Sequence, residues 1–284
     1  MSMHYLKRSY SILKKISAFR ESTLLLLIIL LSIIVTIFAP IFFSYTNFTT
    51  ILLGISLKAI VGFGMTLLLI AGYIDLTVGA TCGLAGAVTA MLISKDWNVE
   101  LPVWSAILVG IAVGMAIGLF NGFFIVKLNI NPFIFTLGGL TLFRSIQFLL
   151  TKAYSITNLP ENFTIIGQQQ FFGIQFPVFL MFAILLIGDY SLRRSNAGKK
   201  LLYIGVNRKS AKLIGINVEK YCMLLFIITG ALAALAGILM TSRVGTATIA
   251  AGTNLEFEAI TAAIVGGARF NGGKGTIFGT FLGT

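Results

Sequence analysis

Long apolar stretches, separated by short polar segments, dominate the pattern of this chain. The clearest stretch, Ser22–Ala39, contains no charged residue. Runs of about twenty apolar residues are long enough to cross a bilayer as helices, and their continuity differs from the alternating pattern of a membrane β-barrel. The pattern therefore predicts an all-α, polytopic helical membrane protein. Its helices are expected over residues 22–39, 49–71, 76–93, 103–126, 133–150, 177–190, 221–241 and 255–266, with a ninth beginning at Thr276.

Three of the predicted helices are short. The segments 177–190 and 255–266 hold fewer residues than a straight crossing needs, so one of them is a candidate re-entrant segment. The ninth helix stops at Thr284, a turn or two after it begins, where its last carbonyl groups would lack partners in lipid. We therefore expect a single transmembrane domain over residues 1–284, truncated on its C-terminal side, and about nine or ten helices in the longer protein.

The distribution of charge predicts the orientation of the chain. Charged residues make up only 11% of it, far fewer than in a soluble domain. The segments that connect the predicted helices lie alternately on the two sides of the membrane. Sixteen Lys and Arg residues fall on one side and three on the other, and the remaining two, Lys58 and Arg144, lie within predicted helices. Because cytoplasmic segments carry the excess of Lys and Arg, the tail 1–21 and the loop 191–220 are expected in the cytoplasm. Topology thus accounts for the net charge of +12, which does not indicate nucleic acid binding.

Residues suited to metal, cofactor or covalent chemistry are sparse. His4 is the only histidine, and Cys82 and Cys222 lie far apart in sequence, in or beside apolar segments. This placement favours two unpaired thiols over a disulfide or a metal site. The Gly-rich turn 267–275 is not a Walker phosphate-binding loop, because its Gly-Lys pair is followed by Gly rather than Ser or Thr. The sequence predicts no metal and no cofactor on this chain, and a protein that is not an enzyme.

The most polar segment is the loop 191–220, which holds eight basic residues. Within it, Asn207 is a favourable N-cap and Gly215 a favourable C-terminal stop, so we predict a helix of about two turns between them. A helix this short is unstable alone in water. We interpret it as lying between the membrane domain and a cytoplasmic partner; the alternative is a basic loop that only fixes the orientation of the chain.

The side chains of this loop helix divide into two groups. The basic residues are expected to face the partner, and the apolar residues to pack against the chain. The basic group is Arg208, Lys209 and Lys212. The apolar group is Ala211, Leu213 and Ile214. Two glycines of the loop, Gly205 and Gly215, permit close backbone approach.

Polar residues within or beside the membrane helices are candidates for a pathway. Arg144 is costly at membrane depth. It either reaches the outer interface or faces a cavity, where it pairs with Glu256 or Glu258 or binds substrate hydroxyl groups. Gln147 lies three residues further on and shares its helix face. Asp75 either caps the following helix or belongs to a gate, and the two glutamates equally suit the positive end of a helix dipole.

Four stretches, taken in order, resemble one family, the sugar-type permease subunits of bacterial ATP-binding-cassette importers. They are Gly72–Gly79 (GYIDLTVG), Asn121–Arg144 with its internal PFIFTLG, the loop Gly205–Ile216, and Gly252–Gly275. The resemblance covers roughly residues 43–284. One departure is Thr77, where the family usually has Ser.

The resemblance implies a subunit that forms the route for a monosaccharide or sugar-like solute across the bacterial inner membrane, with a cytoplasmic N-terminus. A separate cytoplasmic ATPase, which would bind ATP and Mg²⁺, is expected to dock on the loop. The implied ATPase-coupling residues are Gly205, Asn207, Arg208, Lys209, Ala211, Leu213 and Gly215. The candidates for the pathway or gate are Asp75, Asn121, Thr136, Arg144, Gln147, Glu256 and Glu258.

Further partners follow from the same resemblance: a second permease copy or a homologue, and an extracytoplasmic sugar-binding protein. Two other functions stay open. An ion-coupled secondary transporter would need acids buried near the bilayer midplane, whereas the acids here cluster near predicted helix ends. The other is an importer permease of the same class for a small solute that is not a sugar.

Overall fold

The computed structural model describes residues 20–97 and 99–284. These residues are almost entirely helical, apart from connecting segments and one short antiparallel hairpin that pairs Gln170 with Gln175 and Phe171 with Ile174. The longer helices are α2 (Arg20–Phe38), α3 (Tyr45–Ile70), α4 (Val78–Ile93), α5 (Val103–Gly122), α6 (Pro132–Thr151), α8 (Phe176–Arg194), α9 (Asn196–Val206), α11 (Val218–Val244) and α12 (Leu255–Val265). The shorter elements are η1 (Pro40–Phe43), η2 (Lys95–Trp97), the π-helical turn η3 (Phe123–Lys127), α7 (Glu161–Gln168), β1 (Gln170–Phe171), β2 (Ile174–Gln175), α10 (Arg208–Leu213) and α13 (Ile277–Gly283).

Six helices in the described ranges are long and apolar enough to cross a membrane: α2, α3, α5 with η3, α6, α8 and α11. This confirms the predicted polytopic helical class, and each of the nine predicted segments contains a helix. Of the two short candidates, α8 has nineteen residues and is a possible crossing, whereas α12 has eleven. At 1.5 Å per residue α12 is about 16 Å long, roughly half the thickness of a bilayer core.

Helix ends follow local signals in the sequence. Asn131 caps α6 by accepting a hydrogen bond from a first-turn N–H at 3.0 Å, and Pro132 fits the first turn because its nitrogen has no hydrogen to satisfy. Asn217 caps α11 in the same way, also at 3.0 Å. At its other end α11 stops at Gly245, which has the left-handed φ of +74° that terminates helices.

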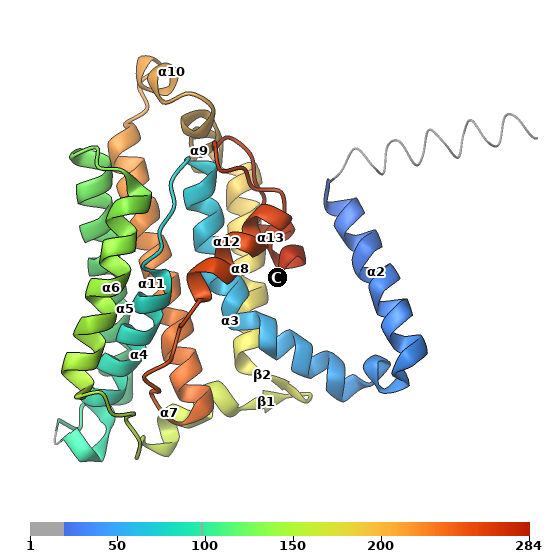
Figure 1. The fold of residues 1–284 in the computed structure, drawn as a ribbon, viewed down its shortest axis with the longest axis vertical. Coiled ribbons are helices and arrows are strands. Elements are labelled where there is room, and N and C mark those ends of the chain that lie inside the picture. The colour runs from blue at the N-terminus through green and yellow to red at the C-terminus, as the bar shows by residue number, and fades with distance from the viewer. Residues whose placement is uncertain (1–19, 98) are drawn as a thin grey trace, which may run out of the picture.

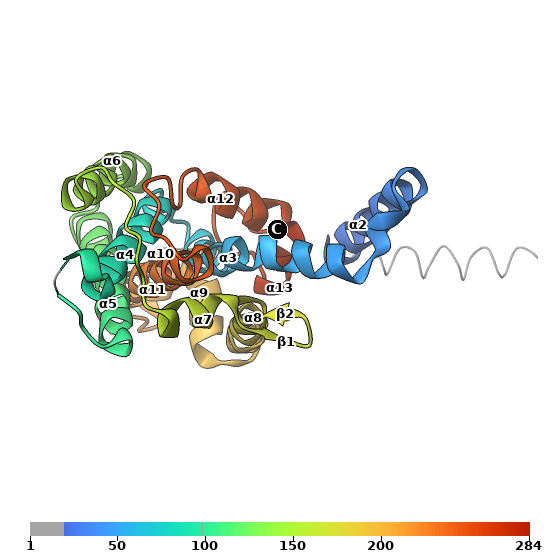
Figure 2. The ribbon, with the colours of Figure 1, turned by 90° about the horizontal axis from the view of Figure 1, so that it is seen from below.

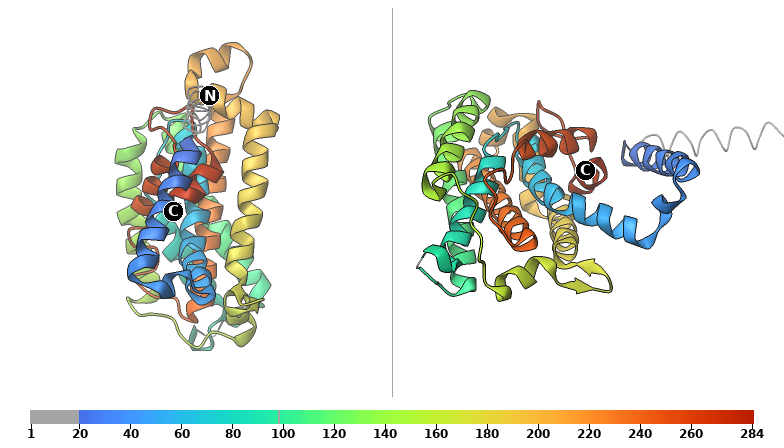
Figure 3. Two further views of the ribbon diagram at one scale, coloured as in Figure 1. Left: turned by 90° about the vertical axis from the view of Figure 1, so that its right-hand side faces the viewer. Right: turned by 60° about the horizontal axis from the view of Figure 1, so that its bottom comes forward.

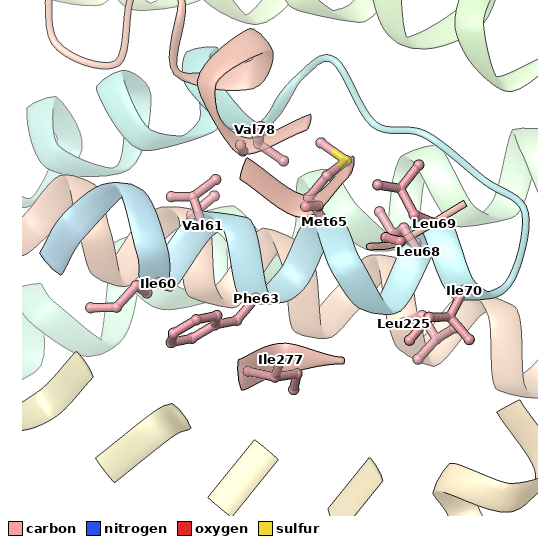
Figure 4. Close-up of a cluster of buried hydrophobic side chains, with 14 of the residues drawn as sticks. Ile60, Val61, Phe63, Met65, Leu68, Leu69, Ile70, Val78, Leu225 and Ile277 are labelled. Carbon is pink, nitrogen blue, oxygen red and sulfur yellow. The ribbon is translucent and has the colours of Figure 1, made fainter. Parts of the chain in front are cut away.

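The centre of the bundle is formed by α3 and α11, and α4, α5 and α8 pack around them (Figures 1 and 2). Small residues let the helices approach closely: a Cβ on Gly230 of α11 would collide with the carbonyl of Gly114 on α5. Large apolar side chains of α3, among them Phe63, Met65 and Leu68, fill the space between the helices (Figure 4).

Two short helices, α4 and α12, begin inside the bundle. The connection 71–77 descends from the upper end of α3 before α4 starts, and the connection 245–254 rises from the lower end of α11 before α12 starts (Figure 1). The two helix starts touch, because a Cβ on Gly79 would collide with the carbonyl of Gly252. The chain therefore brings two irregular segments from opposite ends to one place within the bundle. The connection 71–77 is mostly buried, whereas Ala250, Thr253 and Asn254 of the second connection are exposed.

The N-terminal helix α2 stands apart from the rest of the bundle (Figures 1 and 3). Its first turn is tied to the other helices by Glu21, which pairs with Arg193 of α8 at 3.1 Å and accepts a hydrogen bond from the Thr276 hydroxyl at 2.6 Å. The apolar side chains of α2 are otherwise exposed, as expected for a helix in contact with lipid or with other membrane helices. The predicted tail 1–21 lies, up to residue 19, outside the described residues.

Several elements escaped the sequence analysis. The segment 151–176, which lies between two of the predicted helices, contains α7 and the β1–β2 hairpin. The basic loop contains an additional helix, α9, which Ser195 caps by accepting a hydrogen bond from Gly198 N at 3.0 Å. The helices α7 and α9 span only two or three turns, which is too short for the periodicity of a helix to stand out in the sequence.

Candidate functional site

The loop between α8 and α11 folds as two short helices, α9 and α10, at one end of the molecule (Figure 1). The predicted loop helix is α10. Asn207 caps it by accepting a hydrogen bond from Ser210 N at 3.0 Å, and Gly215 follows it with a φ of +80°. The amide of the next residue, Ile216, donates to the Ala211 carbonyl at 3.1 Å and completes a Schellman-type end. The predicted cap and stop are confirmed.

Arg208, expected to face a partner, is turned toward its own chain. Its guanidinium donates to the carbonyls of Ala71 and Gly72 at 2.9 and 3.1 Å, just beyond the end of α3. It also lies over the ring of Tyr73, 4.0 Å from the ring centre. Burial raises the pKa of the Tyr73 hydroxyl to about 12. These contacts of Arg208 with its own chain were not predicted; they arise because the carbonyls at the end of α3 need donors.

The apolar residues of α10 also differ from expectation. Ala211 is buried, as predicted, but Leu213 is 88% exposed and Ile214 is 66% exposed. The prediction that these two pack against the chain was wrong. The helix is only six residues long, so it buries one narrow face, and the residues at its C-terminal end point away from the bundle. Lys209 is exposed, as expected for a residue that faces outward.

Gly205, near the end of α9, sits where three segments meet. A Cβ at this position would collide with the Ile70 carbonyl of α3 and with the backbone of Gly273 in the Gly-rich turn 267–275. The same carbonyl accepts a hydrogen bond from Gly273 N at 2.8 Å. The predicted close backbone approach at Gly205 is confirmed, and it joins the loop to α3 and to the segment that follows α12.

A groove of about 560 Å³ opens between these three segments. Exposed apolar side chains line and border this groove, although this end of the molecule carries the largest number of Lys and Arg residues. Its lining includes Gly72, Val206, Arg208, Lys209 and Phe270. Val206 is 75% exposed and Phe270 is 53% exposed. We call this groove, with the neighbouring Leu213 and Ile214, the loop surface.

Two further candidates, Asp75 and Asn121, form a buried polar cluster with Thr77 at the start of α4. Asp75 Oδ1 accepts hydrogen bonds from the backbone and hydroxyl of Thr77 at 2.8 and 2.6 Å. The Asn121 amide, from α5, donates to Thr77 Oγ1 at 2.7 Å and to both Asp75 oxygens at 3.3 Å. Asp75 therefore fixes the cap residue Thr77 rather than capping α4 itself, and it ties the connection 71–77 to α5.

Arg144 is held in the bundle by backbone and amide groups. It donates to the Ala251 carbonyl at 2.7 Å and to Gln147 Oε1 at 3.2 Å, which confirms that Arg144 and Gln147 share a face. The alternative that Arg144 pairs with Glu258 was wrong, because Glu258 pairs with Lys58 at 3.0 Å. Glu256 lies near enough to interact with Arg144 electrostatically, without a direct ion pair among the described residues.

Glu256 is only 4% exposed, and its Oε2 has no hydrogen-bond partner within the described part of the chain. This oxygen packs over Gly79 in the first turn of α4, where any Cβ would collide with it. Asp75 and Glu256 thus both lie near helix ends, as predicted, but these ends are inside the bundle. Thr136 is buried and donates a hydrogen bond to the Pro132 carbonyl of its own helix at 2.7 Å.

Some residues of the site were not predicted. Lys58, Thr77, Tyr73 and the glycines that accommodate the acids lie in contact with predicted residues. Lys58 gave the clearest signal, as a cation in the middle of an apolar stretch. No three His, Cys, Asp or Glu side chains in residues 20–97 and 99–284 are grouped so that they could hold a metal ion.

Comparison with known proteins places the chain in a family. It is 35% identical over 260 residues to the ribose import permease protein RbsC of Haemophilus influenzae, covering 90% of this chain and 79% of that protein. It is 34% identical to the D-allose transport system permease protein AlsC of Escherichia coli, covering 89% of this chain and 78% of that protein. It is 33% identical to the L-arabinose transport system permease protein AraH of the same organism, covering 89% and 76%.

No solved structure matches the chain. Residues 47–284 match a family described as the permease component of the branched-chain amino acid transport system. The match extends over most of the described chain. It includes the loop surface, the cluster around Asp75, and Arg144 with Glu256. The chain therefore belongs to this family of transport permeases, whose members are membrane subunits rather than enzymes.

Proposed function

We propose that this chain forms the solute route of an ATP-binding-cassette importer for a monosaccharide or sugar-like compound. The relatives named for ribose, allose and arabinose support the solute class. In this proposal the protein lies in a bacterial inner membrane with its N-terminus in the cytoplasm. The excess of basic residues in the tail and in the loop 191–220 supports that orientation.

The observation that carries the proposal is the loop surface. Leu213 and Val206 are 88% and 75% exposed in a segment rich in Lys and Arg, which would lie in water rather than in lipid. Exposed apolar side chains gathered in such a segment are typical of a binding surface. The proposed occupant is a cytoplasmic ATPase subunit, which would hold ATP and Mg²⁺. A second permease copy or homologue and an extracytoplasmic binding protein complete the proposed importer.

The contacts suggest how such a partner would act on the route. The loop is joined to the end of α3 through Gly205 and Arg208. The connection that follows α3 carries Asp75, which is bound to Asn121 on α5. A movement of the docked ATPase would therefore shift the loop, the end of α3 and the start of α4 together. Such a rigid-body movement is a common way to open a central site to one side at a time.

The proposal is tested with the full-length permease, its ATPase and its binding protein, co-expressed and reconstituted in vesicles. We expect the ATPase to co-purify and the vesicles to take up D-ribose, D-allose or L-arabinose only when ATP is supplied. Uptake driven by a proton or sodium gradient without ATP would instead identify a secondary transporter. L-leucine is included because the family description names branched-chain amino acids; uptake of leucine but no sugar would overturn the solute class alone.

A further inference from the structure

An ion pair lies on the surface of the bundle, within its membrane-crossing part. Lys58 lies near the middle of α3 and pairs with Glu258, in the first turn of α12, at 3.0 Å. Both side chains remain nearly half exposed, at 46% and 45%. Because α3 is long enough to cross the membrane, its middle lies far from both aqueous phases.

A charged pair that is half exposed at this depth does not suit contact with lipid. Ionisable side chains within membrane segments face the interior of a bundle or a water-filled cavity, and they mark solute pathways. Lys58 is too far from either helix end for its ammonium group to reach the interface easily. The exposed half of the pair therefore indicates water, or a solute, on this side of α3.

The pair adjoins a cleft whose lining holds both polar and apolar residues. This cleft of about 210 Å³ is lined by Lys58 and Glu258 together with Arg243 and Thr253. The ion pair is therefore accessible from this cleft.

We infer that the Lys58–Glu258 pair lines the solute route and binds an uncharged, polyhydroxylated solute. The ammonium group offers hydrogen-bond donors and the carboxylate offers acceptors, which together match hydroxyl groups that both donate and accept. The charges of Lys58 and Glu258 compensate each other, and Arg243 adds a further hydrogen-bond donor to the lining of the cleft. This inference rests on the proposed function and adds to it the face of the chain, formed by α3, α11 and α12, along which the solute passes.

Accessibility to a water-soluble reagent tests the inference in the full-length protein. Cys82 and Cys222 are first replaced by alanine. Lys58→Cys and Glu258→Cys are then compared with Met115→Cys, which lies near the middle of α5 and is 43% exposed. A charged methanethiosulfonate reagent is applied to each variant in lipid nanodiscs, where it reaches both faces. We expect Lys58→Cys and Glu258→Cys to react at least tenfold faster than Met115→Cys. Equal, slow reaction at all three positions would overturn the inference.

A double variant separates a solute-binding role from a purely structural one. Lys58→Met with Glu258→Leu removes both charges and keeps an apolar contact between α3 and α12, which a merely structural pair would tolerate. We expect ATP-driven uptake of D-ribose, or of whichever sugar the wild type transports, to fall at least tenfold while the ATPase still co-purifies. Uptake at the wild-type rate would refute the binding role. Failure of the wild type itself to bind the ATPase would count against the proposed function instead.

Discussion

At the scale of single residues, Arg208 shows how one side chain can join a surface loop to the interior. Its guanidinium supplies donors to the carbonyls of Ala71 and Gly72, which lie beyond the last turn of α3. Carbonyls at a helix end have no partner within the helix, and a cation there also complements the helix dipole. The planar fork of arginine contacts two carbonyls at once while stacking on Tyr73, which lysine cannot reproduce.

The first residue-scale prediction concerns Arg208→Ala. Hydrogen bonds from a charged group contribute about 1.5–3 kcal/mol, so the link between loop and α3 should weaken by roughly that amount. We expect sugar uptake to fall several-fold and the binding protein to lose its stimulation of ATP hydrolysis, while the ATPase still co-purifies.

The neighbouring Lys209→Ala is the matched control, because Lys209 is exposed on the same helix. Lys209→Ala should at most weaken the co-purification of the ATPase. In the complex that still forms, the binding protein should stimulate ATP hydrolysis as in the wild type. Arg208→Lys should recover only part of the coupling, since lysine keeps the charge but not the fork. Wild-type stimulation in Arg208→Ala would show that this contact does not transmit movement.

At the scale of elements, α9 and α10 are too short to be stable alone and depend on what they pack against. Ala211 is the buried residue of α10, and Gly205 anchors α9 against α3 and the Gly-rich turn. Gly215 differs from Gly205: its φ of +80° favours glycine, but a Cβ there would meet no atom within 4 Å. The two glycines are therefore required for different physical reasons.

This difference predicts unequal effects of substitution. Gly205→Val should displace α9 from the end of α3, since overpacking of this kind costs about 1–3 kcal/mol. Gly215→Ala should cost only about 1 kcal/mol of backbone strain. We expect Gly205→Val to insert at normal levels but to lose most ATPase co-purification and uptake, and Gly215→Ala to retain most of both. Membrane levels measured by immunoblot provide the normalisation, and the reverse order of effects would contradict this account.

At the scale of the whole molecule, two irregular segments enter the bundle from opposite ends and place Asp75 and Glu256 inside it. Irregular backbone at membrane depth is tolerated where protein surrounds it. Here the first turns of α4 and α12 touch through Gly79, and α5 contributes Asn121. The arrangement places buried carboxylates and irregular backbone together, next to the proposed route.

The orientation of the molecule gives the last prediction. The end that carries α9 and α10 should face the cytoplasm, because it holds the excess of basic residues. Lys199→Cys on α9 and Gln169→Cys beside the hairpin are both exposed single-cysteine sites for labelling. In intact spheroplasts an impermeant maleimide should label Gln169→Cys and should label Lys199→Cys only after lysis. Labelling of Lys199→Cys from outside would reverse the topology.

The sequence alone determined the helices that the apolar segments form, and the order of those helices. Apolar runs of membrane-crossing length predicted the helices, and Asn207 and Gly215 predicted the ends of α10, because these signals depend on local composition and backbone conformation. The sequence also identified polar residues whose burial within a membrane is energetically unfavourable, among them Arg144, Asp75 and Glu256.

Only the tertiary structure decided which of these residues meet. It turned Arg208 inward and left Leu213 exposed, joined Asp75 to Asn121, and paired Glu258 with Lys58 rather than with Arg144. Lys58 and Glu258 are two hundred residues apart, and no local pattern states that α12 starts within the bundle beside the middle of α3. Partners of this kind are set by how short helices pack against long ones, which is a property of the assembled bundle rather than of any segment.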